Sequence, residues 1–170
     1  MIYEFIKLFG PELVSVKLKG INKTSLKSNH YWLMAIIPKL KNLKALTLYL
    51  SELSSITYDF FKFLNKALTY FAKNGGDLKY FGLHHFNQGN TQEYLYGCLK
   101  HMPNVEVLNF NSFALKISDA KAISKVLSDF KCVKELILNN AGLSTETIKE
   151  IADGVMRAKQ LEIIRMANHS

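Results

Sequence analysis

Short runs with an apolar residue at every second position alternate along this chain with longer runs whose apolar residues lie three or four positions apart. Near residue 133, for example, Leu136 and Leu138 have the spacing of a strand, whereas Ile148 and Ile151 have the spacing of a helix. Side chains alternate across a strand and recur every 3.6 residues around a helix. This order therefore predicts a strand, a corner and a helix, and an α/β fold.

The strand pattern recurs six times. The copies start near residues 13, 43, 78, 105, 133 and 161, at intervals of 30, 35, 27, 28 and 28 residues. Helical patterns occupy the intervals, at residues 25–40, 58–73, 93–102, 118–130 and 147–156. The last three intervals are nearly equal, which indicates an internal repeat. One strand and one helix cannot cover their own apolar face, so we expect the copies to stack around one continuous core, as a single domain over residues 1–170.

Polar residues and glycines mark the ends of these helices. Ser118, and either Ser144 or Thr145, precede helical patterns and can accept hydrogen bonds from first-turn amides. The Asn-Gly-Gly run at 74–76 predicts a helix end after Lys73, with one of the glycines in the left-handed conformation.

The repeated pattern is L-x-x-L-x-L-x-x-(Asn, Cys or small)-x-L, with a full helix in each copy. It resembles the leucine-rich repeats of the ribonuclease-inhibitor type over residues 13–170. The ninth position departs from the usual Asn or Cys, and here holds Ile21, Ser51, Phe86, Phe113, Ala141 and His169. The resemblance implies a solenoid of about six repeats, with a parallel sheet on the concave face and helices on the convex face.

In such repeats the side chains beside the strand leucines project from the concave face. Those proposed to bind a partner are Lys44, Thr47, Tyr49, Lys79, Tyr80, His84, Asn109, Asn111, Asn139 and Arg165, and the same face also includes Lys17, Lys19, Gly82, Glu106, Lys134 and Glu162. A mixture of aromatic, amide and charged groups is typical of a polar protein interface. A solvated face with no partner is the alternative.

The helical pattern at residues 58–73 has more large apolar residues than one core-facing stripe needs. Phe60, Phe63, Leu64, Leu68 and Phe71 can face the core, which leaves Tyr58, Phe61 and Tyr70 displaced around the helix. Exposed aromatic residues favour a docking site. A broad core contact is the alternative.

Both ends of the chain are also apolar. Residues 1–12, which include Phe5 and Phe9, either cap the first copy or dock on another subunit. The last copy has a strand pattern without a following helix, so we expect Ile163, Ile164 and Met166 to lie at an open edge.

Charge adds a second hypothesis about the partner. The net charge is +8, and the basic surplus lies in residues 1–85, which hold twelve lysines and five acidic residues. Lysines could contact RNA phosphates, but the chain has only two arginines, which provide bidentate recognition of phosphates and bases. A nucleic-acid-associated subunit is therefore the less favoured reading. A regulatory adaptor of a GTPase or ubiquitin pathway is implied by the family resemblance alone.

Residues that would support catalysis or a cofactor do not cluster in the sequence. His84 and His85 would point to opposite faces of a strand, and no Cys or His group has the spacing of a zinc site. Cys98 and Cys132 fit apolar helical patterns, so we expect both to be reduced core residues. Reduced cysteines favour an intracellular protein, in the cytoplasm or the mitochondrion. The longest apolar run, 31–37, is far shorter than the roughly 20 residues of a membrane span. We therefore expect no enzyme and no cofactor, but a protein–protein interaction module that serves as an accessory or scaffold subunit of a larger assembly.

Overall fold

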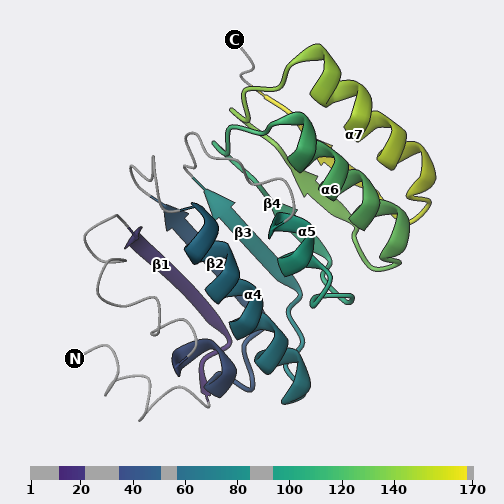
Figure 1. Cartoon of the computed structure of the whole chain (residues 1–170). Helices are drawn as coiled ribbons and strands as arrows, with labels where there is room; N and C mark the ends of the chain where they lie inside the picture. Colours follow the sequence, from purple (N-terminus) through teal and green to yellow (C-terminus); the bar gives the residue numbers. More distant parts are fainter. Residues whose placement is uncertain (1–11, 22–34, 51–56, 85–93, 168–170) are drawn as a thin grey trace.

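A computed structural model gives the structure of the chain and describes residues 12–21, 35–50, 57–84 and 94–167. Over these residues the chain forms one six-stranded parallel sheet and four α-helices (Figure 1), which confirms the predicted α/β class. The elements are β1 (Ser15–Ile21), the 3₁₀ helix η2 (Ile37–Lys39), β2 (Ala45–Leu50), α4 (Thr57–Lys73), β3 (Tyr80–His84), α5 (Tyr94–Leu99), β4 (Val107–Asn109), α6 (Ile117–Asp129), β5 (Glu135–Ile137), α7 (Thr145–Arg157) and β6 (Ile163–Arg165).

The strands follow one another across the sheet in chain order, β1 to β6, and share one register, apart from an irregularity between Leu18 and Ile21 of β1. The residues that pair along one row are Ser15, Ala45, Tyr80, Val107, Glu135 and Ile163. Each of them lies two residues after one of the six starts expected from the sequence. The copies starting at 105 and 133 also share the corner after the strand, because Ser112 and Asn140, their eighth residues, have φ angles of 58° and 55°.

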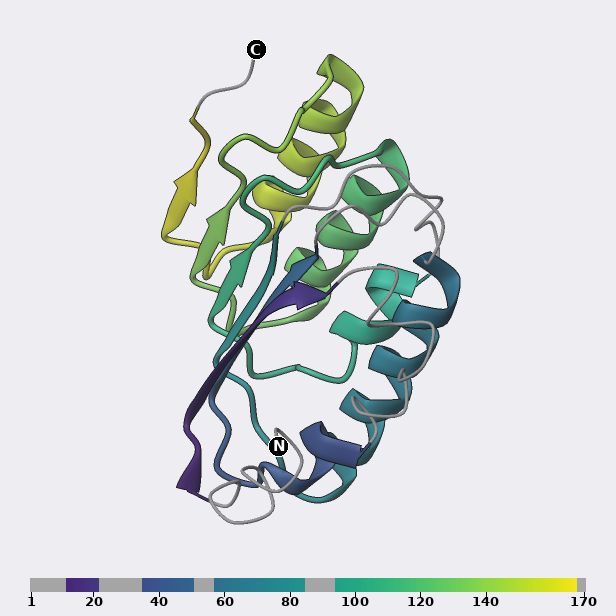
Figure 2. The same ribbon diagram turned by 90° about the vertical axis from the view of Figure 1, so that its left-hand side faces the viewer.

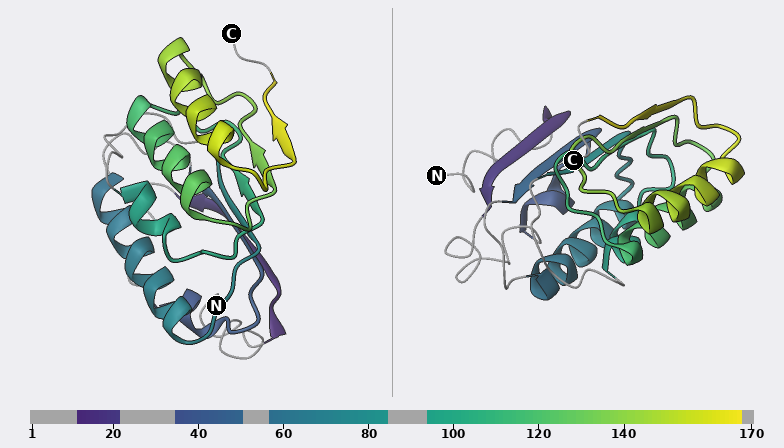
Figure 3. Two further views of the ribbon diagram at one scale, coloured as in Figure 1. Left: turned by 90° about the vertical axis from the view of Figure 1, so that its right-hand side faces the viewer. Right: turned by 90° about the horizontal axis from the view of Figure 1, so that it is seen from above.

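The helices α4, α5, α6 and α7 all lie against the same face of the sheet (Figures 2 and 3). Between the two layers, one row of side chains runs across the strands, with Leu46, Phe81, Leu108 and Leu136 fully buried. Each buried side chain of this size contributes about 1.5–3 kcal/mol to stability. The stacked rows therefore form one continuous core.

Helix α4 buries a wider stripe of apolar side chains than the single core-facing stripe expected from the sequence. Phe61 is fully buried, so the expectation that it is an exposed docking residue is wrong, and it takes part in the alternative, a broad core contact. Its ring packs edge-to-face on Phe60, with the centroids 5.4 Å apart, and its carbonyl accepts a hydrogen bond from Cys98 Sγ of α5. A helix that contacts the sheet, α5 and η2 needs more than one apolar stripe. Tyr70 is exposed, as expected.

The helix ends agree with the sequence analysis except at α6. Helix α4 ends at Lys73, and Gly75 has a φ of 81°, while Ser144 caps α7 by accepting from Thr147 N. At α6, however, the cap is Lys116 rather than Ser118, and its amide donates to the carboxylate of Asp119 at 3.0 Å. Asp119 therefore closes the first turn from within the helix.

Other expectations concern the cysteines and the chain ends. Cys98 is buried in α5, but Cys132 lies in the connection after α6, so its placement in a helical pattern is wrong. Burial raises the pKa of the Cys98 thiol well above its usual range. Ile163 and Ile164 of the edge strand β6, and Met166 just after it, are exposed, as expected.

Several expectations fall on residues that the structure does not describe. They concern Phe5, Phe9, His85 and the side chain of Tyr58. Among the described residues, no helix combines the length and apolar character that crossing a membrane requires.

Candidate protein-interaction surface

The face of the sheet turned away from α4 to α7 carries most of the side chains proposed for recognition, and we call it the sheet surface. Strand alternation and the shared register place on it Ser15, Lys17, Lys19, Ala45, Thr47, Tyr49, Tyr80, Gly82, His84, Val107, Asn109, Glu135, Ile137, Ile163 and Arg165. Side chains from separate copies thus meet because the strands pair in register, although they lie about 30 residues apart in the sequence.

A stack of three side chains crosses β1, β2 and β3. The Tyr49 and His84 rings are nearly parallel, with centroids 4.6 Å apart and an interplanar angle of 16°. The ammonium group of Lys19 lies 5.3 Å from the centroid of the Tyr49 ring. A cation at this distance is attracted to the ring. The stack therefore orients Tyr49, which remains half-buried, on the sheet surface.

Gly82 provides the space in which this stack sits. A Cβ atom at Gly82 would lie 3.1 Å from Thr47, Tyr80 and His84 alike. Thr47 and His84 are only 3% and 5% exposed, although both were expected to contact a partner. Burial makes these two side chains supports for the surface, whereas Tyr49 and Tyr80 are its accessible aromatic groups.

Tyr80 is linked to Asn109 on the next strand. The Asn109 side-chain amide donates a hydrogen bond of 2.6 Å to the Tyr80 hydroxyl, and its carbonyl accepts one of 3.0 Å from the backbone amide of Asn111. Both ends of the Asn109 amide are therefore fixed. Asn111 and Asn139, at equivalent positions of neighbouring copies, are half-buried, and Arg165 pairs with Glu135.

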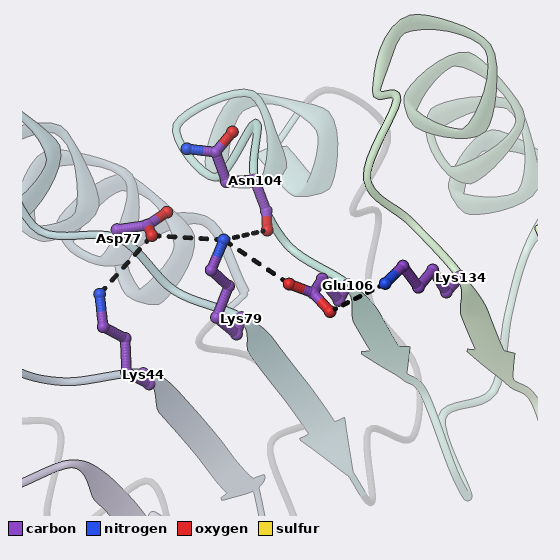
Figure 4. Close-up of polar contacts among 6 residues, drawn as sticks. All are labelled: Lys44, Asp77, Lys79, Asn104, Glu106 and Lys134. Atoms are coloured by element: carbon purple, nitrogen blue, oxygen red, sulfur yellow. Dashed lines mark hydrogen bonds and ion pairs between the residues drawn. The ribbon is translucent and has the colours of Figure 1, made fainter. Parts of the chain in front are cut away.

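A row of alternating charges lies where β2 to β5 begin (Figure 4). Asp77 lies 3.5 Å from Lys44 and 3.4 Å from Lys79, and Glu106 lies 3.6 Å from both Lys79 and Lys134. Lys79 also donates to the carbonyl of Asn104 at 3.4 Å. The candidates Lys44 and Lys79 therefore already have acidic partners within the chain.

The pairing was not anticipated, although the sequence holds a signal for it. Lys44, Lys79, Glu106, Lys134 and Glu162 are the second residues of successive copies. Backbone bonds of 2.8 Å join Lys44 to Lys79, Lys79 to Glu106, Glu106 to Lys134 and Lys134 to Glu162. Equivalent positions of a repeat lie side by side, so the change of sign from Lys79 to Glu106 and from Glu106 to Lys134 predicts the ion pairs there. Lys44 and Lys79 have the same sign and are bridged instead by Asp77, which lies outside this position.

Asp77 gives this row a pH dependence. Burial alone would raise the pKa of its carboxyl group, but hydrogen bonds from Asn104 and Lys79, together with the charges of Lys79 and Lys44, lower the pKa below the usual 3.8. A carboxylate with a lowered pKa stabilises the folded state above its unfolded-state pKa, and this contribution is lost as the pH falls through the folded-state pKa.

We therefore expect Asp77→Asn to unfold at a lower urea concentration than the wild type at neutral pH. The difference should shrink as the pH is lowered below 3.8, where the wild-type carboxylate also becomes neutral. High salt should shrink it as well, because these side chains are partly exposed. A difference that stays constant from neutral to acid pH would show that Asp77 acts through packing instead.

Two lysines on the sheet surface differ from those in the charged row. Among the described residues, no carboxylate lies within ion-pair distance of Lys17 or Lys19, and both side chains are exposed. The β1 end of the surface is thus positively charged.

Across the described ranges, no three His, Cys, Asp or Glu side chains gather closely enough to hold a metal ion. No protein-family model and no curated protein matches the chain.

Proposed function

We propose that this chain is a leucine-rich-repeat solenoid whose sheet surface binds another protein, as a non-catalytic accessory or scaffold subunit of a larger assembly. The shared register of the six strands, four of which are followed by an α-helix, supports the repeat architecture. Stacked repeats expose one extended face built from equivalent positions, and such faces are suited to recognising a partner.

The observation that carries the proposal is the ordered patch formed by Tyr49, Tyr80 and Asn109. Tyr49 is held by stacking on His84, and Tyr80 by the hydrogen bond from Asn109. Side chains that are already ordered lose little conformational entropy when a partner binds. Aromatic anchors of this kind often contribute most of the binding energy at protein interfaces.

The charge of the surface indicates what the partner presents. Lys17 and Lys19 leave the β1 end positive, so an acidic segment of the partner fits there. RNA phosphates are the alternative partner for Lys17 and Lys19. The structure adds no further lysines to such a site, because Lys44 and Lys79 are paired with acidic groups of the chain itself.

Photocrosslinking from defined positions tests the proposal. A benzophenone amino acid at residue 17 of the sheet surface, or at residue 139 two positions after the end of β5, reports on this face, and the same group at the exposed helix residues Lys66 or Lys121 is the control. In native extract, we expect one discrete protein adduct from positions 17 and 139, and none from the helix positions. Adducts from the helix positions alone, or adducts that disappear after ribonuclease treatment, would contradict the proposal.

A matched set of variants tests the aromatic anchors. We expect Tyr49→Ala with Tyr80→Ala to reduce the yield of the adduct at position 139 about tenfold or more, because both large contacts are lost. Tyr70→Ala, which removes an exposed tyrosine from α4, should leave the yield unchanged. Circular dichroism verifies that each variant is folded, and Tyr80→Phe separates loss of the hydroxyl group from loss of the ring. An unchanged yield from the folded double variant would exclude these anchors.

A further inference from the structure

A separate apolar surface lies at the last copy, and we call it the C-terminal edge. It comprises Ile148, Ala152 and Met156 of α7, together with Ile164 and Met166 in and beside β6. Met156 is 76% exposed, and Ile164 and Met166 are each 41% exposed. One strand earlier, the equivalent Leu136 and Leu138 are fully buried. The rows that form the core thus end in side chains that are exposed to solvent.

The helix positions of this edge are those at which neighbouring copies contact one another. Ile148, Ala152 and Met156 lie 28 residues after Ala120, Ser124 and Ser128 of α6. Those α6 positions face α7: Ala120 is buried, and Arg157 donates hydrogen bonds to the hydroxyl groups of Ser124 and Ser128. A repeat face that contacts only solvent is usually polar. Here two of the three contact positions are instead large and apolar.

The backbone of β6 presents a matching edge. Ile163 N and Arg165 O are bonded to β5, through Lys134 O and Leu138 N. Because a strand alternates the direction of its peptide groups, the N–H and C=O groups of Ile164 point away from β5. An exposed strand edge of this kind is a template for pairing with another strand.

The pattern of residues along α7 is complementary to itself. If two α7 helices pack antiparallel about Ala152, Ile148 of one copy meets Met156 of the other, and the small Ala152 side chains allow close approach at the centre. Lys149 and Asp153 lie one residue after Ile148 and Ala152, at one side of this stripe. In the antiparallel pair, Lys149 of each copy would lie beside Asp153 of the other copy. Neither is ion-paired within the part of the chain that the structure describes.

From these observations we infer that two copies of the chain associate through their C-terminal edges around a two-fold axis, with α7 packed against α7 and β6 paired antiparallel with β6. A two-fold interface uses the same patch on both subunits. The stripe of Ile148, Ala152 and Met156, and the pairs of Lys149 with Asp153, allow this arrangement. This surface is distinct from the sheet surface, so the two can be tested separately.

Sedimentation analysis of the full chain, from about 1 μM to about 1 mM, tests the inference over the range of weak to moderate dissociation constants. We expect a monomer–dimer equilibrium. Met156→Glu should raise the dissociation constant about tenfold or more, because it places a charge in the apolar stripe of both subunits. Lys121→Glu, an exposed change on α6, is the control and should leave the constant unchanged.

Charge reversal tests the two-fold geometry itself. Lys149→Asp and Asp153→Lys should each raise the dissociation constant about threefold to tenfold, because each puts like charges side by side twice per dimer. The double reversal should restore the wild-type value. Under mild oxidation, Ala152→Cys should form a disulfide between copies, whereas Lys121→Cys should not.

Three results would overturn the inference. One is a monomer over the whole concentration range, and another is a dimer that Met156→Glu leaves intact. The third is open-ended growth into larger oligomers, which a head-to-tail contact would give and a two-fold contact would not.

Discussion

Replacing Phe61 with alanine is expected to lower the free energy of unfolding by about 3–5 kcal/mol, the range for removing a buried aromatic ring from a core. The side chain is fully buried and packs edge-to-face on Phe60. The backbone carbonyl of Phe61 also accepts a hydrogen bond from Cys98 Sγ of α5. Alanine would leave a cavity between α4 and α5 that rigid neighbours cannot fill. Urea denaturation followed by circular dichroism measures the change.

Tyr70 is the matched control on the same helix. It is 51% exposed, so Tyr70→Ala should change the free energy of unfolding by no more than about 0.5 kcal/mol. The comparison separates the two readings of the aromatic residues on this helix. If Phe61→Ala were no more destabilising than Tyr70→Ala, the ring would be on the surface, and a docking role for Phe61 would be supported.

Replacing Gly154 with alanine is expected to destabilise the protein, although alanine is the better helix former. A Cβ atom at Gly154 would lie 2.5 Å from the Cα atom of Ser124 and 2.7 Å from its hydroxyl oxygen. Backbone cannot rotate away as a flexible side chain can, so α6 and α7 must move apart. Overpacking of this kind costs about 1–3 kcal/mol. It outweighs the gain of up to about 1 kcal/mol from helix propensity.

Gly97 in α5 provides the opposite case. A Cβ atom there would meet only the Asn65 side chain, at 3.6 and 3.9 Å, which is ordinary contact. Gly97→Ala should therefore leave stability unchanged or raise it by up to about 1 kcal/mol. Chemical denaturation of both variants measures the difference in sign. A stabilising effect of Gly154→Ala would contradict the close packing of α6 on α7.

The repeat pattern was sufficient to predict the strands and their alignment. A one-residue slip would move every apolar side chain to the other face, so the positions of Leu46, Leu108 and Leu136 fixed the register. The end of α4 was also predictable, because Gly75 adopts a conformation that other residues avoid.

The surroundings of single side chains were less predictable. Phe61 is buried because α5 packs beside α4, and helical periodicity on one helix does not reveal a second neighbour. Thr47 and His84 occupy positions that face away from the helices, yet side chains on adjacent strands cover them. Alternation along a strand assigns the face of a side chain but says nothing about what its neighbours bury.

For the proposed site too, the sequence predicts the face on which a side chain lies but not the contacts that hold it there. The sequence placed Tyr49, Tyr80 and Asn109 on one face, but their stacking and hydrogen bonds depend on the spacing of paired strands. The exposure at the last copy was predicted from the missing helix pattern. The self-complementary stripe on α7 became evident only when α6 showed which positions contact the next helix.

Both proposed surfaces depend on the strands pairing side by side in one parallel register. Nuclear Overhauser measurements on methyl- and phenylalanine-labelled protein test this most directly. We predict contacts between the Leu46 methyl groups and the Phe81 ring, and between the methyl groups of Leu108 and Leu136, because these residues are paired neighbours. Contacts of Leu108 with residues outside its neighbouring copies, or strong cross-strand contacts between α-protons of the kind that antiparallel strands give, would contradict the account.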